Sequence, residues 1–505
     1  MDKSGDADYF SAGITSAVRS QLADMRDVYI VDAKEGIHAP IRLEGSVQKL
    51  DDNLRISYRL FRRKDNVQIA GGKLDGKYQD IFILQDRLVG EIARYLADEF
   101  DLQNFRPAPL RLTNDVTAYD YYLHGLSFLN MPSSQENFDS AIQNFSQSLL
   151  HDEKFISAVS GLCEAYRLKY ETTKLAEWIE RAEHYCLESL SLDGDSAKSN
   201  AAIGAFYRDV GRYEDALNYL TKAIKKDSTS VSVAVALART YDLMQKPHDA
   251  EEIFIDLIQK EPKNWEVYQG YGFFLVRHGR HKEAIDNYKK VLELTPDNVM
   301  AINNLGASYL FLGDFKSAIP IFEKALQLSP TGVAFSNLGS VYYYLGSFDK
   351  AVEFYKKAEH LSPFGVANLN DIADAYHFIS GNDGLSRDYR QRVKFYASKE
   401  IVSNPSSASG YLYLALASAH LGQFSEAKMA LHKAKELDSG YYFSDYVGLR
   451  IAVAEKKIVD IEVQAKKLKL SGYSEKLILA DPYFKYLVTE DVFANVVKNE
   501  VNLNN

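Results

Sequence analysis

The sequence predicts a mainly α-helical protein in which a long stack of helix pairs follows a small α+β domain. Two observations lead to this prediction. Between Ala197 and His420 one helix-pair pattern recurs at a spacing of about 34 residues, whereas the first hundred residues alternate short strand-like and helical segments. The chain has 505 residues, of which 46% are hydrophobic and 25% are charged, so it is long enough and apolar enough to fold both parts.

The small α+β domain is expected to span residues 1–102. Ile14, Val18 and Leu22 recur at helical spacing and predict a helix at 9–24. Alternating or β-branched runs predict strands, with a hairpin turn at Asp51–Asn53 and a long amphipathic helix at the end. These expected elements are strands at 28–31, 41–49, 54–60 and 68–74 and a helix at 81–100.

Three further segments complete the predicted organisation. Residues 103–114 contain Pro107 and Pro109 and are expected to link the small domain to the helices. The array of helix pairs is expected at 115–440, and a helical cap at 441–505. Residues 380–386 (SGNDGLS) interrupt the period, so the unit at 366–405 is expected to be irregular.

The repeated unit has small residues where two helices must approach closely, such as Gly306 and Gly339 in first helices and Ala318 and Ala351 in second helices. Larger side chains at these positions would push the helices apart. The turn between the paired helices falls at regular intervals of 34, 34, 34 and 33 residues, at Gly211, Gln245, Gly279, Gly313 and Gly346.

This pattern resembles the tetratricopeptide repeat family. The strings AINNLGASYLFLGDFKSAIPIFEKALQLSP (301–330) and AFSNLGSVYYYLGSFDKAVEFYKKAEHLSP (334–363) carry nearly every residue type of the motif, and weaker copies flank them. The resemblance implies a right-handed superhelix of about eight helix pairs, whose first helices line an inner, concave face. It also implies that this face binds a peptide or protein segment.

The first hundred residues resemble a second module. The strings DYFSAGIT, LEGSVQKLDDNLRISYRL and DIFILQDRLVGEIARYL are similar to the α/β domain called TolB amino-terminal-domain-like, which precedes such repeats in bacterial adenylate cyclase-associated and CadC-type regulators. The segment LADPYFKYLVTEDVF (479–493) resembles the short terminal segment that closes such arrays. In related chains a cyclase, kinase or DNA-binding domain supplies the output, and no such domain is expected in this sequence.

No motif in the sequence predicts catalysis, a cofactor or a metal site. The patterns HExxH, GxxxxGK[ST], GxSxG and GxGxxG are absent. We interpret His278 and His281, which flank Gly279, as part of a solvated turn. Cys163 and Cys186 lack a CxxC or histidine partner and are interpreted as small buried apolar residues that form neither a disulfide nor a metal site.

Charge and hydropathy limit the partners. The net charge of −10 does not favour a nucleic-acid partner, because phosphate binding needs a basic surface. No apolar run approaches the roughly 18–20 residues that span a bilayer, so no membrane span is expected. A cytoplasmic location is expected because no apolar signal core follows Met1, and the alternative is a periplasmic domain of a longer membrane protein.

Candidate binding residues come from equivalent positions on the first helices. One position carries Asn304, Asn337 and Asp371 in successive repeats, and an amide there offers both a donor and an acceptor to a peptide backbone. The alternative, that the asparagines bond neighbouring helices, remains open. Nearby positions expected on the same face mix aromatic and polar groups: Phe273, Arg277, Phe311, Ser340 and Tyr344.

The sequence therefore predicts a non-enzymatic scaffold or regulatory adaptor for protein partners, without a cofactor. The alternative is the sensory half of a bacterial adenylate cyclase or CadC-type regulator that lacks its effector domain. The small domain lacks the apolar first strand of related modules, so its sheet is expected to present an open edge. Another chain or a second copy of this one is expected to add a strand there, unless short strands and the flanking helices shield the edge.

Overall fold

A computed structural model of the chain describes residues 40–50, 52–100, 113–129, 131, 134–192 and 196–485, together with Thr15, Val18 and Leu22. The chain divides into two compact units: residues 1–169 with 180–195, and residues 170–179 with 196–505. The predicted strand at 28–31, most of the predicted helix at 9–24 and most of the linker at 103–114 lie outside the described residues, as does 486–505.

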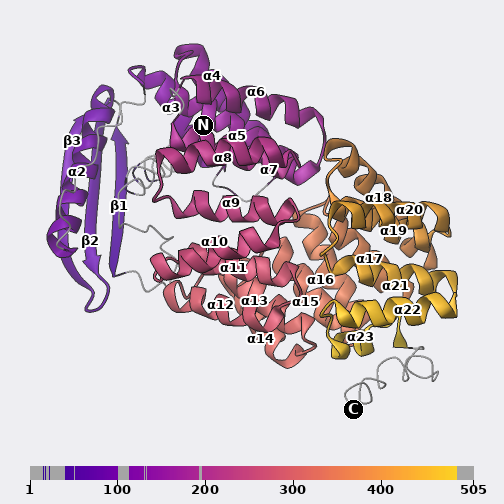
Figure 1. Cartoon of the computed structure of the whole chain (residues 1–505). Coiled ribbons are helices and arrows are strands. Elements are labelled where there is room, and N and C mark those ends of the chain that lie inside the picture. Colours follow the sequence, from indigo (N-terminus) through magenta and orange to yellow (C-terminus); the bar gives the residue numbers. More distant parts are fainter. Residues whose placement is uncertain are drawn as a thin grey trace. The chain divides into compact units, whose positions relative to one another are not determined.

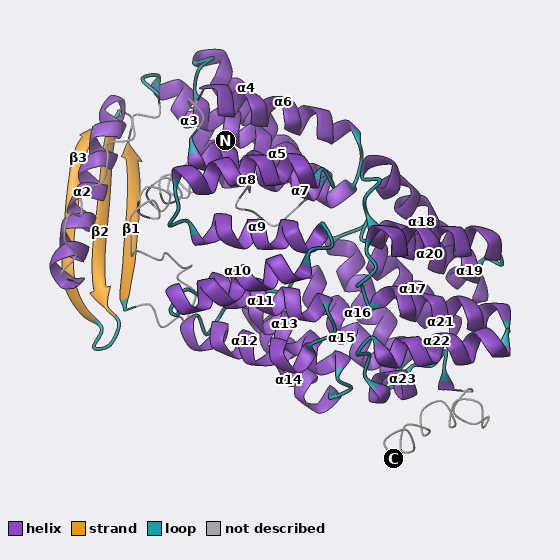
Figure 2. Cartoon of the chain, in the orientation of Figure 1, coloured by secondary structure: helices purple, strands orange, loops and turns teal. Residues whose placement is uncertain are grey.

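The first unit contains a three-stranded antiparallel sheet in the order β1 (Ile41–Leu50), β2 (Asn53–Arg62) and β3 (Val67–Lys77). Leu54, Ile56, Tyr58 and Leu60 alternate along β2 and are buried on one face, which the long helix α2 (Ile81–Phe100) covers (Figure 2). The described strands and α2 confirm the predicted small α+β fold, with boundaries that differ by a few residues. A short 3-10 turn, η1 (Tyr78–Asp80), joins β3 to α2.

Helix α2 and the first array helix, α3 (Val116–Leu129), share one apolar core. Leu88 and Ile92 of α2 pack in the same cluster as Tyr119 and Leu123 of α3. The Tyr119 hydroxyl donates a hydrogen bond of 2.6 Å to the side-chain oxygen of Gln85. The sheet domain and the first helix pair therefore belong to one compact unit.

The helices after α2 form consecutive antiparallel pairs, which Figure 1 labels in chain order. The mainly α fold and its preceding α+β domain are confirmed, and the described residues contain ten pairs where the period indicates about eight. The pairs are α3 with α4 (Gln135–His151), α5 (Ile156–Thr173) with α6 (Glu177–Leu192), α7 (Ala197–Asp209) with α8 (Tyr213–Lys226), α9 (Val231–Leu243) with α10 (Pro247–Lys260), α11 (Trp265–Arg277) with α12 (His281–Leu294), α13 (Val299–Phe311) with α14 (Phe315–Leu328), α15 (Gly332–Tyr344) with α16 (Phe348–Leu361), α17 (Val366–His377) with α18 (Asp383–Ser403), α19 (Ala408–His420) with α20 (Phe424–Leu437), and α21 (Phe443–Glu455) with α22 (Ile458–Leu470), before the short α23 (Glu475–Ala480).

The predicted close contacts within the pairs are present. A Cβ atom on Gly306 would lie 2.6 Å from Cε1 of Phe322, and one on Gly339 would lie 2.7 Å from Cδ1 of Tyr355. Each of these rings lies one helical turn after a small residue of the second helix, Ala318 or Ala351. The small residues therefore make room for an aromatic ring of the paired helix.

The predicted turns between paired helices are also confirmed. Gly211, Gln245, Gly279, Gly313 and Gly346 have φ angles of 79°, 58°, 70°, 70° and 77°. This left-handed conformation ends the first helix, and glycine adopts it without steric cost.

Four of these turns, at Gly211, Gln245, Gly279 and Gly313, contact residues much later in the chain, and we call this line of contacts the seam. The Gln245 amide donates to the carbonyl oxygen of Glu436 (3.1 Å) and accepts from the Ser439 hydroxyl (3.0 Å). The Ser403 hydroxyl donates to the carbonyl oxygen of Lys174 (2.7 Å). The other turn residues of the seam lie against later segments in the same way: Gly211 against 404–406, Gly279 against 471–472 and Gly313 against 476–477.

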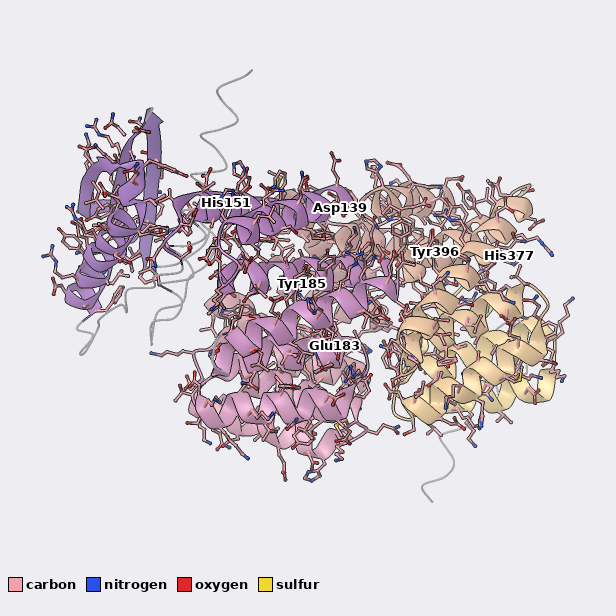
Figure 3. All side chains as sticks on the ribbon, turned by 90° about the horizontal axis from the view of Figure 1, so that it is seen from above. Asp139, His151, Glu183, Tyr185, His377 and Tyr396 are labelled. Carbon is pink, nitrogen blue, oxygen red and sulfur yellow. A yellow bond between two sulfur atoms is a disulfide. The ribbon has the colours of Figure 1, made fainter. Side chains whose placement is uncertain are left out.

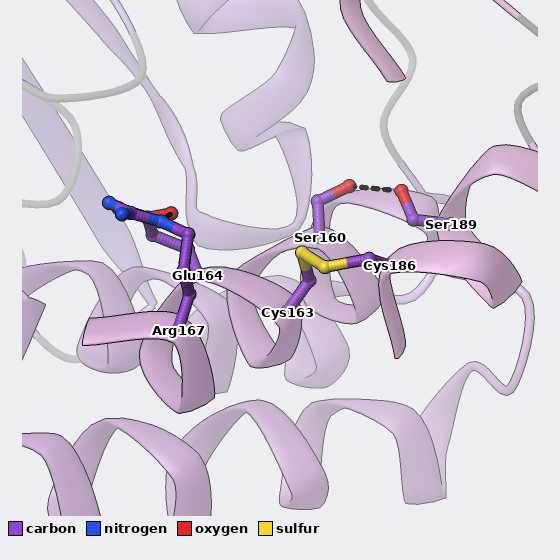
Figure 4. Close-up of a disulfide and its surroundings, with 6 residues drawn as sticks. All are labelled: Ser160, Cys163, Glu164, Arg167, Cys186 and Ser189. Carbon is purple, nitrogen blue, oxygen red and sulfur yellow. Dashed lines mark hydrogen bonds and ion pairs between the residues drawn. A yellow bond between two sulfur atoms is a disulfide. The ribbon is translucent and has the colours of Figure 1, made fainter. Parts of the chain in front are cut away.

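Cys163 of α5 and Cys186 of α6 form a disulfide, with Cα atoms 4.8 Å apart (Figure 4). The interpretation of these residues as unpaired is therefore wrong. The bond depends on the antiparallel packing of α5 on α6, and the two cysteines are 23 residues apart. No local sequence motif therefore indicated that they pair. Beside it, the hydroxyl groups of Ser160 and Ser189 are 2.6 Å apart and share a hydrogen bond.

Candidate functional site

The eight residues predicted for the binding face lie on four first helices of the second unit. Phe273 and Arg277 lie on α11, Asn304 and Phe311 on α13, and Asp371 on α17. The remaining three, Asn337, Ser340 and Tyr344, lie on α15. The chain's own later residues contact some of these side chains and leave others partly open.

Arg277 is fully engaged by neighbours within the chain. Its guanidinium donates to Asp242 (Nε to Oδ2, 2.8 Å) and to Asp438 (Nη2 to Oδ2, 2.6 Å). It also lies over the ring of Tyr441, 5.4 Å from the centroid. Arg277 therefore ties the α9–α11 region to the segment that precedes α21.

Phe311 and Tyr344 pack against the C-terminal helices. The Phe311 ring is edge-on to Tyr442 (5.9 Å between centroids) and to Tyr473 (6.3 Å). Tyr344 belongs to the same apolar cluster, which also contains Leu477. The segment from Tyr442 to Leu477 thus covers the part of the predicted face that these two residues provide.

His281 corrects the interpretation of the histidine pair as a solvated turn. Its side chain is buried and stacks on Phe311 at 4.9 Å, and burial lowers its pKa to about 4. The Nε2 atom of His278 shares a hydrogen bond with the carboxylate Oδ1 of Asp242, which accepts it, at 2.8 Å. The pair differs from the prediction because residues 441–473, far away in sequence, pack over this turn.

Of the other predicted residues, only Phe273 is exposed. Phe273 is 41% exposed, beneath the Arg239 guanidinium at 5.1 Å from its ring centroid. Asn304, Asn337 and Ser340 are half-buried. Asn304 lies beside the Tyr288 hydroxyl of α12, and the Ser340 hydroxyl is bonded within the repeat. The Asn337 amide has no hydrogen-bond partner among the described residues.

Asp371 is the predicted residue with the most perturbed chemistry. It is half-buried on α17. Burial, together with the charge of Asp374 one turn away, raises its pKa to about 7. Near neutral pH the Asp371 carboxyl therefore exists in both protonation states.

Asp374 of α17 is the centre of a buried ion-pair network that sequence analysis missed. Its carboxylate accepts from the guanidinium of Arg390, from that of Arg450 (Nη2 to Oδ1, 2.7 Å) and from the Tyr483 hydroxyl (2.9 Å). Arg390 and Arg450 are only 2% and 1% exposed. Burial alone would raise the pKa of Asp374, but the two arginine charges outweigh it and hold that pKa well below its ordinary value.

The network holds the terminal segment against the array. Arg450 lies over the Tyr483 ring, 3.5 Å from its centroid, and His377, labelled in Figure 3, stacks on the same ring at 5.3 Å. The Tyr446 hydroxyl donates to Asp481 (2.9 Å). The LADPYF string was the sequence signal for this arrangement, since it resembled a segment that closes such arrays, but it did not identify the two arginines.

No group of three or more metal-binding side chains occurs in the part of the chain that the structure describes. None of the helices of that part is long and apolar enough to cross a membrane. Asp374 has donors on both oxygens, so it is not arranged to act as a general base.

Comparison with known proteins identifies the repeats. Family models described as tetratricopeptide repeat match residues 207–274, 266–331 and 297–361. The human protein O-mannosyl-transferase TMTC1 is 28% identical over 34% of this chain and 23% of its own length. Hsp70-Hsp90 organizing protein 3 of Arabidopsis thaliana is 23% identical over 40% of this chain and 36% of its own length.

The chain thus spans less than two fifths of the length of each of these two relatives. Among solved structures, the APC/C hetero-tetramer Cut9–Hcn1 aligns with 81% of this chain and 84% of its own, at 17% identity and a TM-score of 0.42. The repeat period, the helix pairs and the family models agree: this chain contains tetratricopeptide repeats, and residues 207–361 are the part that the family models cover.

Proposed function

We propose that this protein is a non-enzymatic scaffold or adaptor that binds a protein segment along the first helices of its repeats. The observation that carries the proposal is the half-buried Asn337 amide, which has no partner among the described residues and lies one repeat after Asn304. An unpaired amide offers a donor and an acceptor to a peptide backbone. The Hsp70-Hsp90 organizing protein, named for the two proteins that it organises, supports the same class of function.

The open part of the face defines where the partner binds in this proposal. Asn304, Asn337, Ser340 and Asp371 form its polar part, and Phe273 is an exposed aromatic beside it. Arg277, Phe311 and Tyr344 contact residues 438–477 instead. They take part in partner binding only if that segment moves away.

The experiment compares matched double variants by affinity capture from the native cell, followed by mass spectrometry. Asn304→Ala with Asn337→Ala removes the proposed amides, whereas Asn218→Ala with Asn287→Ala removes two asparagines from second helices. The first variant is expected to lose captured proteins that the second retains, since each lost bond leaves a peptide group unpaired at about 1–3 kcal/mol. Identical sets and amounts for both variants would refute binding through these amides.

We also propose strand addition at the sheet edge of the first unit. In the described residues β1 and β3 each pair on one side only, with β2. A strand from another chain, or from a second copy of this one, would satisfy the free N–H and C=O groups of β1. Hydrogen exchange of residues 41–50 with and without the captured partner tests this proposal, and unchanged protection would refute it.

The second candidate function is the sensory part of a regulator whose output domain lies on another chain. It is favoured by the resemblance of residues 43–60 to the TolB-like module, because that string forms the β1–β2 hairpin. Disulfides form and persist mainly in oxidising compartments. The Cys163–Cys186 bond therefore favours the periplasmic alternative over the cytoplasm. Capture of a cyclase or a DNA-binding protein, rather than a structural assembly, would distinguish this function from a scaffold.

A further inference from the structure

Helix α18 departs from the pattern of the other second helices. It has 21 residues, whereas α12, α14, α16 and α20 have 14 each. A helix of 14 residues that began at Asp383 would end at Tyr396, so residues 397–403 are an extension. This is the irregular unit that the interrupted period indicates, and nothing in the function proposed above uses it.

A groove of about 550 Å³ runs along α18. It is lined by Arg387, Lys394, Phe395, Lys399 and Val402 of α18 and by Leu421 from the turn after α19, among others. Phe395 and Val402 are 55% and 72% exposed, which is unusual for an aromatic and a β-branched side chain seven residues apart on one helix. The extension supplies both Lys399 and Val402.

The charges of the groove have one sign. Arg387, Lys394 and Lys399 line it, and no carboxylate does, although the chain as a whole has a net charge of −10. Lys394 pairs with Glu426 at 2.5 Å. Arg387 and Lys399 are exposed and pair with no carboxylate in the described part of the chain.

We propose that the α18 groove binds an acidic amphipathic helix of a partner protein. The groove-lining residues of α18 form a stripe from Arg387 to Val402. These two residues are 15 positions apart, so the stripe extends over about 22 Å, or about four helical turns. Such a stripe matches a helix that presents two apolar residues about seven positions apart and carboxylates beside them. The apolar pair favours a protein segment, since phosphate chains would use the cations and leave Phe395 and Val402 in water.

This surface lies on a second helix, whereas the asparagines of the proposed function lie on first helices. The two bindings are therefore independent, and either can fail without the other. The α18 groove would let the protein hold a second partner while the first-helix face is occupied.

Fluorescence anisotropy of the full chain with two designed peptides tests the proposal. Both peptides have about 15 residues and the same two apolar residues seven positions apart. One carries glutamate at the flanking positions, and the other carries lysine. The acidic peptide is expected to bind saturably and more weakly as salt increases. No saturable binding up to about 1 mM would overturn the proposal, as would equal binding of the lysine peptide.

Matched variants assign the binding to the groove. Phe395→Ala with Lys399→Glu is expected to weaken binding of the acidic peptide about tenfold or more. Met429→Ala with Lys433→Glu changes an exposed apolar residue and a lysine at the same spacing on α20 and is expected to leave binding unchanged. Equal effects of the two variants, with unchanged thermal midpoints, would overturn the proposal. So would a single-stranded oligonucleotide that binds the parent more tightly than the acidic peptide does and loses that affinity in the Phe395→Ala, Lys399→Glu variant.

Discussion

Removing the charge of Asp374 tests the buried network most directly. In Asp374→Asn the buried guanidinium groups of Arg390 and Arg450 lose the carboxylate that both contact. Breaking a buried ion pair by removing one partner costs about 3–5 kcal/mol, because an uncompensated charge stays buried. Since two arginines share this one carboxylate, we expect the upper part of that range.

Urea unfolding followed by tryptophan fluorescence measures the effect. Both tryptophans of the chain, Trp178 and Trp265, lie in the second unit with Asp374, so their fluorescence reports on that unit. Asp256→Asn is the control, because Asp256 pairs with Lys260 on the surface and such a pair contributes less than about 1 kcal/mol.

A triple variant separates lost charge from lost packing. Asp374→Leu with Arg390→Met and Arg450→Met removes all three charges, and apolar replacement of a whole buried ion-pair network is often neutral or stabilising. We expect it to be more stable than Asp374→Asn. The reasoning is refuted if Asp374→Asn and Asp256→Asn unfold at the same urea concentration.

Three further predictions concern packing, pH and the disulfide. Gly306→Leu is expected to lower the urea midpoint, because the larger side chain overpacks against Phe322 and costs about 1–3 kcal/mol of stability. Gly384→Leu on α18 is the control, since nothing lies within 4 Å of a Cβ atom there. Equal midpoints of the two variants would contradict the assigned repeat register. The pKa of Asp371 is about 7 in the folded protein and 3.8 in the unfolded chain. The free energy of unfolding of the parent is therefore expected to fall by up to about 4 kcal/mol as the pH rises from 3.8 to 7. Urea titrations should show Asp371→Asn gaining stability over the parent at pH 7 and not at about pH 4, and a constant difference would refute this. Reduction by dithiothreitol is expected to lower the thermal midpoint of the first unit, since a disulfide that closes a loop of this length contributes about 3 kcal/mol. If dithiothreitol lowers the midpoint of Cys163→Ser with Cys186→Ser by the same amount, the effect does not come from this disulfide.

Local signals made most of the fold predictable. The alternation along residues 54–60 identified β2, because period-two burial needs no knowledge of distant residues. Gly279 and Gly313 marked helix ends because the left-handed turn is a property of the chain at that point. The helix pair α21/α22 has no turn glycine, since Lys456 adopts the left-handed conformation there, so the period gave no indication of it.

The site was less predictable because it depends on long-range packing. Asp374 meets Arg450 across 76 residues and Tyr483 across 109, and neither distance follows from the 34-residue period. The neighbours of Phe311 and Tyr344 also come from far along the chain, since they lie on the C-terminal helices. The sequence therefore placed the eight candidate residues on first helices, but it could not indicate which of them later residues of the chain contact.

The seam changes how the second unit is expected to fold and to respond to force. In an open repeat array each repeat contacts only its neighbours. Its terminal repeats can therefore unfold one at a time, and the array can extend under force without breaking long-range contacts. Here Gln245 is bonded to residues 191 and 192 positions further along the chain. Contacts of such separation slow folding, because a long loop must close before they form. They also bind early repeats to late ones, so that the second unit melts in one step and resists stretching until the seam breaks.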